Sequence, residues 1–145
     1  WNGRNGLGRP CTPLTAASLT LLARAKRPIW PWSDAAGMLV EAFPTAQLRW
    51  WGCPHQLYGP PGARSDAREQ AQRRHRRAAI IEHMSARIEV SPAQRACMLD
   101  APDAIDAVAA TFGAMAAASG RLVHDPPPEA ALEGAMAVHA DRPGT

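Results

Sequence analysis

Two aspartates at the start of an alanine-rich segment have the clearest capacity for chemistry in this sequence. Asp103 and Asp106 open a stretch with apolar residues at helical spacing, which predicts a helix from Pro102 to Ser119. Residues three apart share a helix face, with β-carbons about 5–6 Å apart. Two carboxylates at that separation can hold a hard cation, as metal-assisted phosphoryl chemistry requires. The alternative stays open that Asp103 is a helix-terminal acid favoured by the macrodipole and that Asp106 faces water.

A third acid, Glu41, interrupts the short apolar run of residues 38–43, which lies between Gly37 and Pro44. Such a run is typical of a strand buried on both faces. A buried carboxylate is costly unless it is paired, hydrogen-bonded or bound to metal, so Glu41 is a candidate ligand. The alternative is that Glu41 lies at the open end of the strand and caps the following helix.

Basic residues are concentrated in one segment, residues 64–87, although the whole chain has a formal net charge of only +3 and a pI of about 9.2. Ser65 is expected to cap a long helix through this segment. Its arginines could contact a phosphate backbone. The alternative is a solvated helix face with i,i+4 pairs such as Glu69 with Arg73. The nucleic-acid-binding candidates are Arg73, Arg74, Arg76 and Arg77.

The remaining elements predict one α/β domain, because 145 residues suffice for a single core. Helices are expected over 12–25, 45–51, 65–87, 92–99 and 102–119, and a short final strand over 134–139. No apolar run reaches the roughly 18 residues that span a bilayer, so no membrane partner is expected. The three cysteines are widely spaced and fit no metal or disulfide pattern, which favours a reducing cytoplasm.

Four short motifs follow one another along these elements: Val40-Glu41-Ala42-Phe43-Pro44, Leu57-Tyr58, Asp103-Ala-Ile-Asp106-Ala and Glu133-Gly134. Their order resembles that of the family called domain of unknown function 429. The resemblance covers roughly residues 38–140. Members of that family are identified as predicted nucleases of the ribonuclease H fold, and the wider fold includes RuvC-like resolvases. The resemblance implies central strands flanked by helices, and Mg²⁺, or Mn²⁺ in its place, held by Glu41, Asp103 and Asp106 for two-metal phosphodiester hydrolysis.

One element of that family is not found in this sequence: the first strand, whose Gly-x-Asp segment supplies another metal-binding Asp. We therefore expect a partial ribonuclease H-like fold without its first hairpin, in a fragment with an incomplete active site. Residues 1–37 would be a loop and helix left from the first half, 38–140 the C-terminal part of the domain, and 141–145 a tail. A metal-dependent nuclease-like protein is the leading hypothesis. The alternatives are a non-catalytic nucleic-acid or protein binding module, or a small-molecule phosphate enzyme on the same scaffold.

Overall fold

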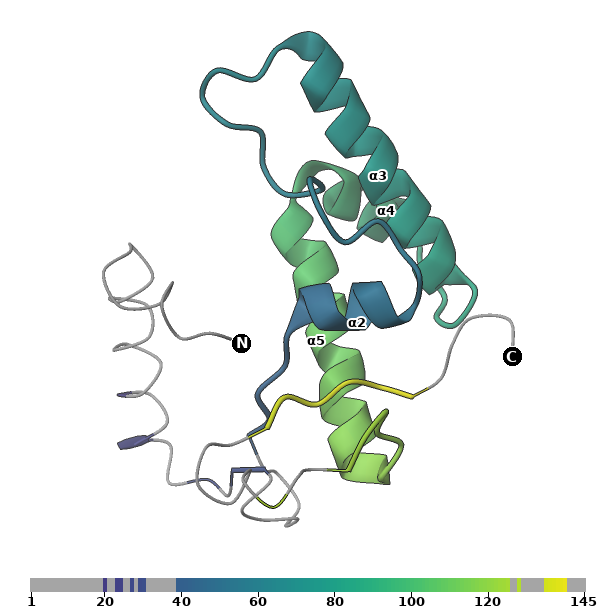
Figure 1. The fold of residues 1–145 in the computed structure, drawn as a ribbon. Coiled ribbons are helices and arrows are strands. Elements are labelled where there is room, and N and C mark those ends of the chain that lie inside the picture. Colours follow the sequence, from purple (N-terminus) through teal and green to yellow (C-terminus); the bar gives the residue numbers. More distant parts are fainter. Residues whose placement is uncertain are drawn as a thin grey trace.

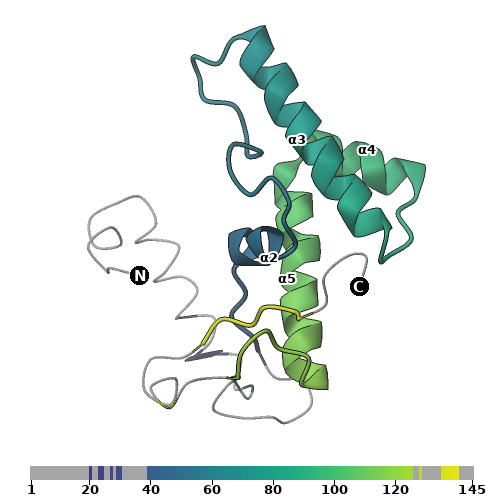
Figure 2. The same cartoon turned by 45° about the vertical axis from the view of Figure 1, so that its right-hand side comes forward.

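The structure, a computed structural model, describes residues 20, 23–24, 27, 29–30, 39–125, 128 and 135–140. More than half of these residues lie in the helices α2 (Pro44–Trp50), α3 (Ala67–Ser85), α4 (Pro92–Asp100) and α5 (Pro102–Ser119). Helix α5 is central, with α2 packed across its middle (Figure 1). Helices α3 and α4 lie beside its N-terminal half (Figure 2). In the part of the chain that the structure describes, three helices thus pack around one alanine-rich helix.

Local signals determine where these helices begin and end. Helices α2, α4 and α5 each start with a proline in the first turn, whose missing N–H has no helical partner to lose. A reciprocal capping box joins Ser91 and Gln94 at the start of α4. Helix α5 ends at Gly120, which adopts φ 67°. The sequence therefore predicts these helices to within about two residues, except that Asp66 rather than Ser65 caps α3.

The core forms where the apolar faces of the four helices meet. Small residues on α5, such as Ala109, let neighbouring helices approach closely, and large side chains fill the space between them. The principal buried members of the core are Leu48, Trp51, Tyr58, Ile80, Ile81, Met84, Met98, Ile105 and Phe112.

The expected α/β fold with central strands is wrong for the part of the chain that the structure describes. Backbone pairing there is limited to isolated bridges. The paired segments are very short, because Pro44 starts α2 directly after the 39–43 run, and a lone short pairing is marginal without neighbouring strands. The apolar helix faces pack against one another instead of against a sheet. The bridges join Ile29 to Leu39 and Ala42 to Ala137 in parallel, and Leu122 to His139 antiparallel.

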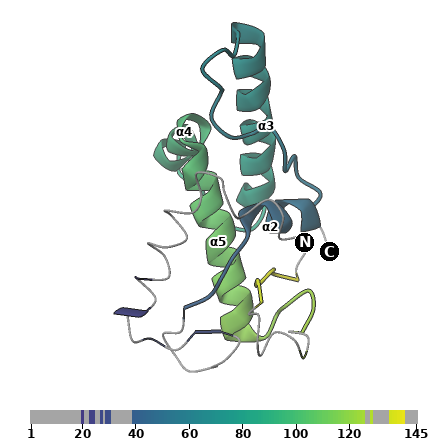
Figure 3. The same ribbon diagram turned by 60° about the vertical axis from the view of Figure 1, so that its left-hand side comes forward.

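The segment 135–140 lies beside the C-terminal half of α5 (Figure 3). The buried Gln47 side chain on α2 holds it: the amide donates to the His139 carbonyl at 3.3 Å and accepts from the His139 N–H at 2.7 Å. The Ala137 N–H also donates to the Glu41 carbonyl at 3.0 Å. These contacts place residues 39–42, α2 and 135–140 side by side.

The remaining sequence expectations concern residues outside the described ranges, or the membrane. The helix over 12–25 lies almost wholly outside the described residues, as do Met38, the Glu133-Gly134 motif and the tail 141–145. Among the described residues, none of the helices has both the length and the hydropathy that crossing a membrane requires.

Candidate functional site

A tyrosine and an aspartate 48 positions apart in the sequence meet at the N-terminal end of α5. The Tyr58 hydroxyl donates a hydrogen bond of 2.5 Å to Oδ1 of Asp106, a charge-assisted bond of the short, strong kind. Burial raises the pKa of Tyr58 well above its usual value, and the neighbouring Asp106 carboxylate raises it further, while the Thr45 side chain acts in the opposite direction. Tyr58 therefore keeps its proton and fixes the orientation of Asp106.

The backbone just before Tyr58 has an unusual conformation. Leu57 adopts φ 55°, in the left-handed region that costs energy for a residue with a β-carbon. Its side chain is 59% exposed, so burial of that side chain does not offset the cost, whereas the next residue, Tyr58, is only 7% exposed. Such backbone strain persists only where the surroundings impose it, and it is often found at functional sites. The loop is held in a conformation that turns Tyr58 inward toward α5.

Arg77 on α3 is a principal restraint on this loop. Its side chain is buried and donates to the carbonyl of Tyr58 at 2.8 Å and to that of Leu99 at 2.6 Å, with a longer contact of 3.4 Å to Gly59. One guanidinium thus ties the Tyr58 loop to the end of α4. Burial lowers the pKa of Arg77 from its ordinary value, but a guanidinium still stays charged at neutral pH.

The other arginines expected to contact nucleic acid also have partners within the protein. Each of them reaches a carbonyl or a carboxylate on a neighbouring element, so the basic face of α3 is largely used to hold the loop and α4. The pair of Glu69 and Arg73, expected from their spacing, forms at 2.7 Å. The partners are Glu69 and the Gly59 carbonyl for Arg73, Asp100 for Arg74, and the Gln56 carbonyl for Arg76.

The three candidate metal ligands do not come together as expected. Asp103 is exposed in the first turn of α5, and Asp106 is half-buried one turn later. Glu41 is exposed in the segment before α2. The argument that a buried carboxylate at this position needs a metal ion therefore does not apply. Within residues 39–125 and the other described positions, no three His, Cys, Asp or Glu side chains form a group that could hold a metal ion. Of the three, Asp103 and Asp106 share one face of α5. Two carboxylates so placed could hold Mg²⁺, which commonly uses one or two carboxylates and fills its shell with water and phosphate oxygens.

Tyr58 and Arg77 are the residues of this site whose roles the sequence does not reveal. Tyr58 is the only tyrosine in the chain and belongs to the Leu57-Tyr58 motif, but nothing in the sequence pairs it with Asp106. Arg77 is surrounded by similar arginines, and nothing in its spacing distinguishes the buried one.

The family described as "Protein of unknown function (DUF429)" has a model that matches residues 3–131 of the chain. The match begins well before residue 38, where the resemblance seen in the sequence motifs starts. Neither the curated proteins nor the solved structures contain a significant match.

Proposed function

The chain belongs to the DUF429 family of proteins of unknown function, and from this premise and the site at the start of α5 we propose that it hydrolyses phosphodiester bonds. The observation that carries the proposal is the 2.5 Å hydrogen bond from Tyr58 to Asp106. A buried phenol that fixes one carboxylate of a pair is the kind of support that metal-binding carboxylates receive from neighbouring residues.

Each residue has a definite role in this proposal. Asp103 and Asp106 would hold Mg²⁺ or Mn²⁺ through carboxylate oxygens. The bound ion would act as a Lewis acid and lower the pKa of a bound water. The Tyr58 hydroxyl donates to Oδ1 of Asp106, so Oδ2 would be the oxygen that contacts the ion. Because its pKa is raised, Tyr58 acts as a hydrogen-bond donor that orients Asp106 and not as a general base.

A nucleic acid is the substrate class we propose, and the cytoplasm is the compartment. Binding through the α3 arginines has weaker support, since all four have partners within the protein. A non-catalytic binding module that uses those arginines would show a steep loss of affinity with salt and no response to metal removal.

The experiment is cleavage of single-stranded and double-stranded DNA and RNA, and of bis(p-nitrophenyl) phosphate, with and without Mg²⁺. We expect metal-dependent cleavage that Asp106→Asn and Asp103→Asn each reduce at least about 100-fold, as loss of a metal ligand should. The matched control is Glu41→Gln, which removes an exposed carboxylate outside the pair and should leave the rate unchanged. Full activity of the Asp103→Asn, Asp106→Asn double variant, or no cleavage of any substrate by the wild-type chain, would overturn the proposal.

A further inference from the structure

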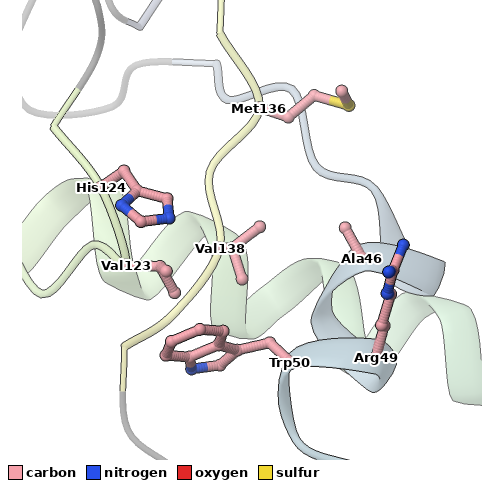
Figure 4. A pocket seen from close by; sticks show the side chains of 7 residues that line it. All are labelled: Ala46, Arg49, Trp50, Val123, His124, Met136 and Val138. Carbon is pink, nitrogen blue, oxygen red and sulfur yellow. The ribbon is translucent and has the colours of Figure 1, made fainter. Parts of the chain in front are cut away.

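A concave site that contains neither aspartate lies between α2 and the segments 121–125 and 135–140 (Figure 4). Its volume is about 360 Å³, at the lower end of the range for sites that bind small molecules. The aspartate pair is at the N-terminal end of α5, whereas Val123 and His124 of this pocket follow its C-terminal end. The two sites share no residue, although α2 reaches both, since Ala46 lines the pocket and the Thr45 side chain contacts Tyr58.

The lining of the pocket combines apolar walls with positive charge and contains no acid. Arg49 and His124 lie on opposite sides of the view in Figure 4, with Val138 between them. The Arg49 side chain is exposed in the last turn of α2, and no ion pair joins it to an acid in the part of the chain that the structure describes. A guanidinium placed in this way is suited to bind an anionic group. The imidazole of His124 borders the opposite end of the cavity.

The aromatic wall of the pocket is held in place. Trp50 is half-buried, and its indole Nε1–H donates to the carbonyl of Ala140 at 3.0 Å. This bond fixes the ring beside Val138, so the wall is formed before any ligand arrives. A rigid indole next to aliphatic side chains suits a flat, apolar ring.

We propose that this pocket binds a small molecule that has one planar aromatic ring system and one anionic group. The ring system would lie against Trp50 and Val138, and the anion would contact Arg49 at one end of the cavity. The volume admits about one ring system with one charged substituent, so a nucleoside monophosphate or an aromatic carboxylate fits and a polymer does not. This binding goes beyond the proposed hydrolysis and does not depend on it.

The test is isothermal titration calorimetry of the full chain with four probes: adenosine 5′-monophosphate, indole-3-acetate, adenosine and inorganic phosphate. We expect the first two to bind with dissociation constants below about 1 mM, and the last two, which lack either the anion or the ring, to bind at least tenfold more weakly. Tighter binding of the monophosphate would identify phosphate as the anion, and tighter binding of indole-3-acetate would identify carboxylate.

Two variants test the two halves of the site. Arg49→Gln removes the charge and should weaken binding about tenfold or more. Ala46→Phe fills the cavity next to Trp50 and should abolish binding while Arg49 stays in place. The matched control is Arg68→Gln, an exposed arginine of α3 far from the pocket lining. Asp106→Asn should keep full binding, which separates this test from that of the hydrolysis.

Two results would overturn the proposal. One is that none of the four probes binds. The other is that inorganic phosphate binds as tightly as the monophosphate and that Ala46→Phe changes nothing, which would indicate surface charge alone. Circular dichroism of each variant establishes that it has folded.

Discussion

A β-carbon at position 113 would lie 2.8 Å from the carbonyl oxygen of Ala137, so helix α5 and the segment 135–140 touch through their backbones at Gly113. The same β-carbon would lie 3.1 Å from that of Ala42. Neither neighbour is the end of a flexible side chain. The absence of a side chain at Gly113 is therefore what lets residues 39–42 and 135–140 reach the central helix.

Gly113→Ala should destabilise the protein by about 1–3 kcal/mol, because the added methyl group overpacks this contact. The direction of this change in unfolding free energy is informative, since glycine to alanine in an open helix interior stabilises by roughly 0.5–1 kcal/mol. Urea unfolding measures the effect. Gly59→Ala is the matched control: its β-carbon would have nothing within 4 Å, and stability should change by no more than about 0.5 kcal/mol. Equal stability of Gly113→Ala and wild type would contradict this close contact.

Arg77→Met should cost about 2–4 kcal/mol of unfolding free energy, because buried carbonyls of Tyr58 and Leu99 lose a charged donor. Arg77→Lys should restore only part of the loss, since an ammonium cannot reproduce the fork of a guanidinium. Arg74 lies on the same face of α3 as Arg77 and forms an exposed ion pair with Asp100 of α4. Arg74→Gln breaks this pair and should cost no more than about 1 kcal/mol. Similar losses for Arg77→Met and Arg74→Gln would mean that the buried bonds contribute little.

The sequence predicts features that depend on neighbouring residues in the chain. The helices expected over 45–51, 92–99 and 102–119 are confirmed to within about one residue. Their signals, such as the prolines that start α2, α4 and α5, act within one helical turn. The spacing of Glu69 and Arg73 predicts their ion pair for the same reason.

Features that depend on distant contacts are the ones the sequence does not predict. Glu41 stands in an apolar run, but whether that run is buried depends on partner segments far away, and here it is half exposed. Arg77 and Arg76 are neighbours of the same type, and only the fold buries one of them. The hydrogen bond from Tyr58 to Asp106 joins two short motifs whose proximity no periodicity indicates.

Cys97 should react with a thiol reagent at pH 8, and Cys53 should not until the protein unfolds. Cys97 is exposed, whereas burial raises the pKa of the Cys53 thiol to about 11. The raised pKa also means that the contribution of Cys53 to stability is intact below about pH 9.0 and is lost as the pH rises toward 11. Ellman's reagent measures the reactivity in a chain that carries Cys11→Ser, so that only Cys53 and Cys97 remain. The matched variant carries Cys97→Ser as well, and fast reaction of this variant while folded would contradict the burial of Cys53.

His83 should make the protein less stable in mild acid. Burial lowers its pKa and the Arg87 charge lowers it further, while its Nε2 has no hydrogen-bond partner among the residues that the structure describes. A lowered pKa means that the neutral imidazole is favoured in the folded state, so its contribution to stability is present above about pH 6.5 and is lost as the pH falls. His83→Gln should therefore make the decline in unfolding free energy between pH 7 and 5 shallower. His75→Gln, an exposed histidine of the same helix, should leave the decline unchanged. An unaltered slope in His83→Gln would exclude this cause.

Tyr58→Phe should slow phosphodiester cleavage about 10–100-fold, because Asp106 loses the hydrogen bond that orients it. The readout that a purely structural effect would not change is the Mg²⁺ concentration for half-maximal rate, which should rise as the carboxylate becomes less well positioned. Ser85→Ala is the control for general destabilisation, since it also removes one side-chain hydrogen bond, to the Ile81 carbonyl, but far along α3. If Tyr58→Phe and Ser85→Ala show the same rate and the same Mg²⁺ dependence, Tyr58 only packs against α5 and does not position Asp106.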